Sequence, residues 1–262
     1  MTPDELDRCA CRTEDRLDTA ASMTEAGPVI RRVLRAVLAT SLAGATLVLH
    51  SPWASGAVSP DASTTVLLRV GSRGPLVVAL QQRLSALGYW LGPTTGDFTD
   101  ATQQAVFAFQ KVASLARDGV VGPLTTAALA RGPRPRARSR AGYVVEVDLG
   151  RNVVLLVRDG RLLTTLNASS GGGYLYTSGG VTSRALTPTG HFRVFRQVNG
   201  PDVSPLGELW RPMYYSGGYA IHGAASVPPY PLSHGCVRVS IEAMNWLWAT
   251  KRLVVGTVVW VY

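Results

Sequence analysis

Two short segments, Ser233-His234-Gly235-Cys236-Val237-Arg238 and the earlier Ile221-His222-Gly223, stand out in this 262-residue chain. They decide its interpretation. Cys236 is the only cysteine after residue 11, and histidines stand two and fourteen positions before it. A free thiol is only a few per cent ionised at pH 7, and a nearby imidazole can activate it. The glycine before Cys236 permits a sharp turn, from which the amides of Gly235 and Cys236 would stabilise an oxyanion. The segment therefore predicts a cysteine nucleophile.

Three interpretations compete for the histidines and Cys236. In the first, Cys236 attacks an acyl carbon and His222 is its base. In the second, the side chains of His191, His222, His234 and Cys236 bind zinc, but a histidine and a cysteine two positions apart are unusually spaced and no second pair precedes them. In the third, the histidines are structural and Cys236 is buried, which leaves the Ser-His-Gly-Cys cluster unexplained. The first interpretation is favoured, with no metal and no cofactor.

The same residues resemble the active-site signature of the L,D-transpeptidases (YkuD-type catalytic domain). Thr187-Pro188-Thr189-Gly190-His191-Phe192 is similar to that family's Thr-Pro-x-Gly-x-Phe motif. A plain turn before a strand is the alternative for residues 187–190. The resemblance covers about residues 143 to 262.

The resemblance implies acyl transfer in two steps. Cys236 attacks the carbonyl between the third and fourth residues of a peptidoglycan stem tetrapeptide, and the terminal D-alanine leaves. A side-chain amine of a second stem then attacks the thioester and accepts the acyl group. His222 is implied as the base, with its ring oriented by the backbone carbonyl of Gly223. The other implied residues, which supply oxyanion N–H donors or position the loop and the substrate, are His234, Gly235, Ser233 and Arg238.

Two alternatives stay open for the function. One is an L,D-carboxypeptidase that uses water as the acceptor, since acceptor choice depends on pocket shape. The other is a non-catalytic cell-wall-binding protein, against which the intact His222/Cys236 pair argues.

Residues 66–131 show helical periodicity. Leucines 76, 80, 84 and 87 recur at helical spacing between Gly74-Pro75 and Gly88. A second run extends from Thr102 to Leu115, and a short third run with Leu124, Ala128 and Leu129 follows Gly122-Pro123.

This region resembles the peptidoglycan-binding-domain-1 repeat, a small three-helix bundle. The matching motifs include Gly71-Ser72-Arg73-Gly74, Gly96-Asp97-Phe98 and Asp118-Gly119-Val120-Val121-Gly122. Thr99 departs from the family, which usually has glycine there. Residues 66–131 are therefore expected to form a separable wall-binding module.

Residues 132–142 are rich in Pro and Arg, which predicts an extended, solvated linker. From Tyr143 onward the period changes to that of strands. The expected strands are residues 143–149, 153–158, 162–167, 191–198, 220–222 and 257–262. Residues 240–251 are expected to form a helix capped by Ser240. The predicted fold class is multidomain: a small three-helix bundle followed by a mainly β (β-sandwich/barrel-like) catalytic domain, residues 143–262, with one clear helix.

Residues 1–57 are expected to be a cytosolic tail and a signal or anchor segment. Arg31-Arg32-Val33-Leu34-Arg35 precedes an uncharged run of fourteen residues, Ala36 to Leu49, which is shorter than the roughly 20 that span a bilayer. Ser55-Gly56-Ala57 offers small residues for cleavage. An uncleaved anchor is the alternative, and a start at Met23 would give a signal of ordinary length. The protein is expected to be exported to the cell wall, with membrane contact only through this segment.

The positive net charge of the chain favours binding to an anionic partner. The formal charge is +9, almost all from arginine, since Lys111 and Lys251 are the only lysines. Removal of residues 1–57 leaves 20 basic and 10 acidic residues, which suits an anionic wall. The chain has no nucleic-acid motif. Cys9-Ala10-Cys11 has the wrong spacing for zinc, and one cysteine in the folded region excludes a disulfide framework.

Overall fold

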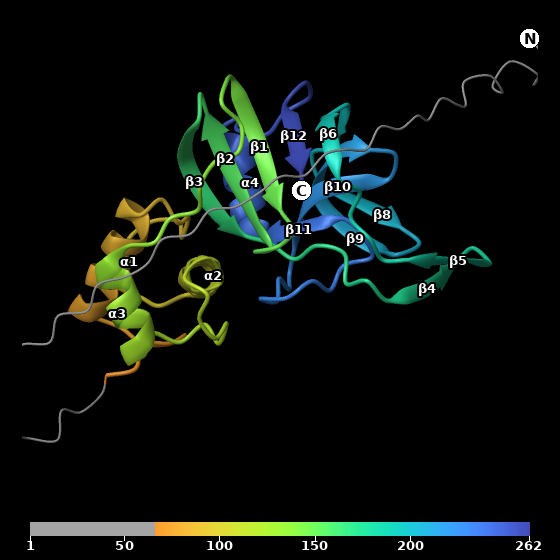
Figure 1. Cartoon of the computed structure of the whole chain (residues 1–262). Helices are drawn as coiled ribbons and strands as arrows, with labels where there is room; N and C mark the ends of the chain where they lie inside the picture. The colour runs from red at the N-terminus through yellow and green to blue at the C-terminus, as the bar shows by residue number, and fades with distance from the viewer. Residues whose placement is uncertain (1–65) are drawn as a thin grey trace, which may run out of the picture. The chain divides into compact units, whose positions relative to one another are not determined.

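The computed structural model describes residues 66–262, which belong to one compact unit (Figure 1). The predicted signal segment, residues 1–57, and both of its cysteines lie outside the described residues. Within the described part, no helix has the length and apolar character needed to cross a membrane.

Three helices occupy the N-terminal region: α1 (Pro75–Ala86), α2 (Asp100–Val112) and α3 (Pro123–Arg131). α1 and α3 begin with proline, whose fixed φ suits the first helical turn. α2 is capped by Thr99, whose hydroxyl accepts the N–H of Thr102 at 3.4 Å. The residue that departs from the family pattern is therefore a helix cap.

The expected positions of these helices are confirmed, but two of the leucines in the helical runs do not face the core. Leu76 is 56% exposed and Leu124 is 75% exposed, whereas Val77, beside Leu76, is fully buried. Leu80, Leu84 and the alanine and leucine of α3 at positions 128 and 129 are buried as expected.

The β region contains two five-stranded sheets and one hairpin. The first sheet has the order β3-β2-β1-β12-β6, and its strands are β3 (Arg161–Asn167), β2 (Val153–Arg158), β1 (Tyr143–Asp148), β12 (Val258–Val261) and β6 (Gly190–Arg193). The second has the order β11-β10-β9-β7 with β8 also on β9, and its strands are β11 (Val237–Ser240), β10 (Tyr219–Ala224), β9 (Gly207–Ser216), β7 (Arg196–Gln197) and β8 (Pro201–Ser204). The hairpin consists of β4 (Leu175–Ser178) and β5 (Val181–Arg184) and projects at the lower right of Figure 1.

The two sheets pack against each other around one core. That core joins Val145 and Val259 of the first sheet to Ile221 and Val239 of the second. Helix α4 (Ile241–Ala249) covers the second sheet and adds further apolar side chains to the core. The hydroxyl of Ser240 accepts the Ala243 N–H at 3.2 Å, so this residue caps α4 as predicted. The arrangement confirms a mainly β architecture.

The expected strand over residues 191–198 is wrong in extent, because the chain changes sheets there. Val194 donates its N–H to the carbonyl oxygen of Thr257, directly before β12 of the first sheet, at 2.9 Å, and Phe195 donates to that of Tyr214 in the second sheet at 2.9 Å. One strand therefore ends at Arg193 and the next begins at Arg196.

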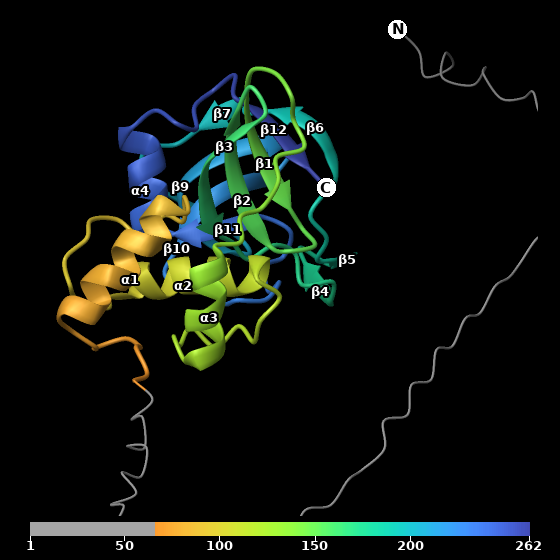
Figure 2. The ribbon, with the colours of Figure 1, turned by 60° about the vertical axis from the view of Figure 1, so that its left-hand side comes forward.

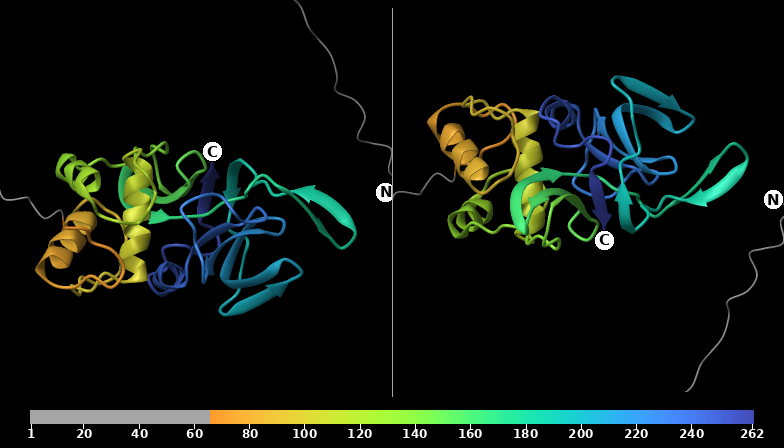
Figure 3. Two further views of the ribbon diagram at one scale, coloured as in Figure 1. Left: turned by 90° about the horizontal axis from the view of Figure 1, so that it is seen from below. Right: turned by 90° about the horizontal axis from the view of Figure 1, so that it is seen from above.

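A second core lies between the helices and the first sheet. Val153, Leu155 and Val157 of β2 point away from the main core and pack with the buried side chains of α1, α2 and α3. Both faces of β2 are thus covered, which explains its unbroken apolar sequence. Backbone bonds extend the contact, from Trp90 N–H to Thr165 O at 3.0 Å and from Thr165 N–H to Gly88 O at 2.7 Å. Figures 2 and 3 show the helices against this sheet, with α2 (yellow) between α1, α3 and the strands.

Residues 132–142 contain no helix or strand, and their arginine side chains at 134, 136, 138 and 140 are exposed. The backbone, however, is bound to the sheet. The carboxylate of Glu146, which is fully buried, accepts the N–H groups of Arg138 and Ser139 and the Ser139 hydroxyl. The backbone of the expected extended, solvated linker is thus bound to the sheet, because the buried carboxylate needs these donors, whereas its arginine side chains are exposed.

Candidate active site

The parallel pairing of β10 and β11 brings the two predicted motifs together. Ile221 pairs with Val237, and His222 pairs with Arg238. Paired residues of neighbouring strands share a face, and residues two apart on one strand share it too. Ile221 and Val237 face the main core. His222 and Arg238 therefore belong to the opposite face of the second sheet. Cys236 directly precedes β11 and packs against the cluster that includes Ala220, two residues before His222 on β10, so it lies on the same side.

His222 is held as a neutral base. Its ring is buried, and Nδ1 lies 2.9 Å from the carbonyl oxygen of Gly223. Since a carbonyl only accepts, Nδ1 carries the proton and Nε2 is left as an acceptor. Burial lowers the pKa of His222 from 6.5 to about 4; the Gly223 hydrogen bond opposes this effect and the charge of Arg238 adds to it.

Cys236 is a free, half-buried thiol. Its Sγ lies 3.7 Å from the carbonyl oxygen of Gly218. Burial raises the pKa of the thiol, while a backbone hydrogen bond from Ala220 and the charge of Arg238 lower it. Near pH 7 the pair is therefore an uncharged thiol and an uncharged imidazole, so that the thiol proton is removed when the sulfur attacks.

The turn before Cys236 requires a glycine. Gly235 has φ 135°, and a Cβ there would lie 2.5 Å from a ring carbon of Tyr219 and 2.8 Å from the carbonyl oxygen of Leu186. The hydroxyl of Ser233 donates to the carbonyl of Cys236 and accepts the N–H of Gly235 at 3.0 Å. Ser233 thus joins both sides of the loop through its hydroxyl.

The same hydrogen bond corrects one expectation. The N–H of Gly235 already binds the Ser233 hydroxyl, so this amide is not directed at a substrate in the structure. The backbone amides of His234 and Cys236 remain as the candidate oxyanion donors.

Thr187 has a role that the sequence interpretation missed. Its buried hydroxyl donates to the carbonyl oxygen of Gly235 at 2.8 Å and accepts the N–H of Gly171 at 2.9 Å. The first residue of the Thr-Pro-x-Gly-x-Phe motif therefore fixes the loop of the cysteine. The similarity of this motif to the family motif drew attention to Thr187. The sequence could not show that its hydroxyl binds Gly235, 48 residues away.

The other two histidines of residues 66–262 do not join His222. The ring of His234 packs edge-to-face on Tyr176, with centroids 4.8 Å apart, beside the β4–β5 hairpin. His191 stacks on Trp260 of the first sheet at 4.5 Å. Among residues 66–262, no group of three or more His, Cys, Asp or Glu side chains is arranged to hold a metal ion.

Comparison with known proteins matches two families to the described residues. Residues 142–261 match the L,D-transpeptidase catalytic domain family, and residues 73–129 match the putative peptidoglycan binding domain family. The crystal structure of the L,D-transpeptidase from Xylanimonas cellulosilytica is 55% identical, with a TM-score of 0.72; the match covers 74% of this chain and 97% of that one. The chain belongs to the L,D-transpeptidase family. In this L,D-transpeptidase, the peptidoglycan-binding family match precedes the catalytic domain.

A curated relative shares only a part of its length. The N-acetylmuramoyl-L-alanine amidase CwlL of Bacillus licheniformis is 46% identical over 70 residues. This match covers 26% of the L,D-transpeptidase chain and 19% of the amidase, so the chain spans about a fifth of that protein.

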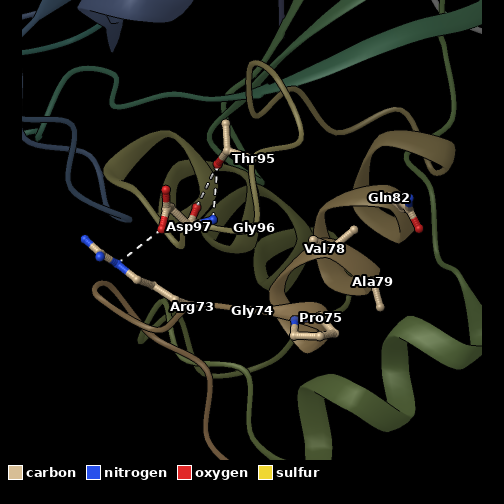
Figure 4. Close-up of a pocket in the computed structure, with 9 residues that line it drawn as sticks. All are labelled: Arg73, Gly74, Pro75, Val78, Ala79, Gln82, Thr95, Gly96 and Asp97. Atoms are coloured by element: carbon tan, nitrogen blue, oxygen red, sulfur yellow. Dashed lines mark hydrogen bonds and ion pairs between the residues drawn. The ribbon is translucent and has the colours of Figure 1, made fainter.

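The helical region of this L,D-transpeptidase has two pockets beside α1. The first, shown in Figure 4, has a volume of about 540 Å³ and is lined at its rim by Arg73 and Asp97, whose charged groups lie 3.2 Å apart. The second, of about 750 Å³, is mainly apolar and includes Leu68, Leu80 and Leu129.

Proposed function

We propose that this protein is an exported cysteine acyltransferase that cross-links peptidoglycan stem peptides through a thioester on Cys236. One observation carries the proposal. A buried, neutral His222, oriented by the Gly223 carbonyl, lies on the same side of the sheet as the free thiol of Cys236, which packs against the cluster that includes Ala220 of the same strand. This is the arrangement that a general base and a nucleophile need.

The first half-reaction forms the thioester. Nε2 of His222 takes the thiol proton while Sγ attacks the carbonyl carbon between the third and fourth stem residues. The amides of His234 and Cys236 stabilise the oxyanion. The C–N bond then breaks, and His222 returns the proton to the leaving D-alanine amine.

The second half-reaction transfers the acyl group. The side-chain amine of a second stem attacks the thioester, and His222 accepts its proton. The C–S bond breaks, and the proton returns to the sulfur. The products are a cross-linked peptide and the free thiol. Arg238, on the same sheet face as His222, is proposed to position the substrate.

The helical region is proposed to bind peptidoglycan, in the three-helix form of its family. The family match over residues 73–129 and the two pockets beside α1 support this role. The net positive charge favours an anionic wall.

Export is proposed to depend on residues 31–49, which supply a basic flank and an apolar run. Initiation at Met23 should suffice. Expression from Met23 followed by cell fractionation tests this point, and protein found only in the cytosol would contradict it.

The reaction is tested by incubating the protein with a purified stem tetrapeptide and determining the product masses. We expect a cross-linked dimer and released D-alanine, a thioester adduct on Cys236, and no turnover by Cys236→Ser. Substitution of His222 by alanine should slow acylation by about 10²–10⁴-fold. His191→Gln, on the first sheet, is the control histidine variant.

Other outcomes would redirect the proposal. Turnover by Cys236→Ser, or turnover lost with a chelator and restored by zinc, would overturn the cysteine mechanism. A tripeptide without any dimer would identify an L,D-carboxypeptidase instead. Binding to insoluble wall without any product from the tetrapeptide would favour the wall-binding alternative.

A further inference from the structure

Lys111 of α2 is a buried lysine whose hydrogen-bond partners all lie in the catalytic domain. Its side chain is 3% exposed. Nζ donates to Asn152 O at 2.8 Å, to Asn167 Oδ1 at 2.5 Å and to Ala168 O at 2.9 Å. An ammonium group has three N–H donors, so these three acceptors use all of them. A lysine with so many buried bonds holds its acceptors in fixed positions.

Two of the three acceptors of Lys111, Asn167 and Ala168, begin a segment that contacts the chain on both sides of Cys236. This support segment, residues 167–171, starts at the last residue of β3. Ser169 exchanges two backbone hydrogen bonds with Arg238, at 3.0 and 2.9 Å. The carbonyl of Ser170 accepts the N–H of Ser233 at 2.9 Å. The support segment thus holds the residues that precede and follow the nucleophile.

The helical region also contacts the chain segment that connects His222 to Cys236. Asn167, whose Oδ1 binds Lys111, directs its Nδ2 to Gln104 Oε1 at 2.6 Å and to the Val227 carbonyl at 3.3 Å. Gln104 of α2 donates its own Nε2 to the same Val227 carbonyl at 3.3 Å. Lys111 therefore also fixes the side-chain amide of Asn167. Together with Gln104, this amide binds the Val227 carbonyl between His222 and Cys236.

We propose that Lys111 and Gln104 are positioning residues for the reaction at Cys236. Both belong to the region that matches a peptidoglycan-binding family, and they act through the support segment and Val227. The helical region is consequently part of the scaffold of the active site, in addition to any binding of wall. The inference uses the proposed acyl transfer as one of its two readouts.

The test uses full-length protein and the variants Lys111→Met and Gln104→Leu. Each removes the polar contacts while retaining a side chain of similar length. The matched control is Lys251→Met, because Lys251 is the only other lysine and is exposed. Acylation of Cys236 by the tetrapeptide is followed by mass spectrometry to obtain kcat and KM. Alkylation of the thiol by iodoacetamide is measured separately.

We expect kcat for acylation to fall about 10- to 100-fold in both variants with KM changed less than about twofold, because small displacements of a nucleophile have such effects. The alkylation rate of Cys236 should also change, and Lys251→Met should match the unsubstituted protein in both assays. Wild-type kcat and wild-type alkylation in the folded variants would overturn the inference. If Lys111→Met does not fold, the partly exposed Gln104→Leu decides. If the unsubstituted protein does not process the tetrapeptide, the proposed function fails, and the alkylation rates alone decide the positioning role.

Discussion

The protonation state of His222 is the residue-scale property with the clearest kinetic consequence. Burial lowers its pKa to about 4, so the imidazole remains a free base down to acidic pH. We predict that kcat/KM for acylation is nearly constant from pH 6 to 8 and falls on the acid side only as pH approaches 4 to 5. Stopped-flow or quenched acylation at a series of pH values measures this. An acid limb near pH 6.5, the ordinary histidine value, would contradict it.

Substitution of Thr187 tests whether its hydrogen bonds to the loop before Cys236 contribute to stability and to acylation. Thr187→Val keeps the shape of the side chain but removes the hydroxyl that joins Gly171 to Gly235. We predict a loss of about 1–3 kcal/mol in the free energy of unfolding, since two buried groups lose their partner. Acylation should slow as well. Thr187→Ser, which retains the hydroxyl, should restore most of both quantities, and equal behaviour of the two variants would argue against the hydrogen bonds.

At this scale the sequence indicated the proposed reacting residues but not their supports. His222 and Cys236 belong to short motifs whose chemistry is local, so a role for them could be proposed from the sequence. The contact of Thr187 with Gly235 joins segments 48 residues apart, and that of Lys111 with Ala168 joins segments 57 apart. Such contacts depend on tertiary packing. For the same reason the engagement of the Gly235 amide by Ser233 was not foreseen.

Among the elements, those with a strong apolar pattern were predictable and those at the surface were not. β1, β2 and β12 have apolar runs, and α2 has a clear helical stripe. β4 and β8 carry mostly exposed or half-buried residues, so they lack the alternation that signals a strand. In the second sheet only β10 and, in part, β7 were expected; β9 and β11 were missed although several of their residues are buried.

At the scale of elements, one buried carboxylate joins β1 to the chain segment that precedes it. Glu146 of β1 accepts hydrogen bonds from Arg138, Ser139 and the hydroxyl of Tyr262. Glu146→Leu leaves these donors without a partner, and we predict a loss of about 2–4 kcal/mol in the free energy of unfolding. Urea denaturation measures it. The control Glu208→Leu, on an exposed side chain, should change stability by less than about 0.5 kcal/mol. Equal losses in the two variants would contradict the assigned role.

At the scale of the whole molecule, the helical region and the catalytic domain share a core. Removal of residues 66–131 would expose Val153, Leu155 and Val157 of β2 to water. We therefore predict that the truncated catalytic domain is poorly soluble, and that residues 66–262 unfold in a single calorimetric transition. This replaces the expectation of a freely separable module. Two resolved transitions, or a truncated domain with full turnover, would show that the shared core is dispensable.

The buried Lys111 should make the stability of the protein depend on pH. Burial lowers its pKa from 10.5 to about 7, and the charge of Arg117 contributes a smaller lowering. Between these values the unfolded chain binds more protons at this site than the folded protein. The free energy of unfolding should therefore rise with pH, by about 2 kcal/mol from pH 7 to 9 relative to Lys111→Met. Denaturation curves of both proteins across this range test it, with Lys251→Met as control; parallel pH dependence in the two would refute the assignment.

The place of β12 in the first sheet has a consequence for how the chain is made. β12 comprises residues 258–261, yet it lies between β1 and β6, and Val144 pairs with Val258. Pairing of residues so distant in sequence is slow. While the polypeptide emerges from a ribosome or passes through a translocation pore with its N-terminus first, β6 lacks its inner neighbour. The sheet is complete only after residues 258–261 are delivered, so a premature stop codon before residue 258 leaves β1 and β6 without the strand that joins them.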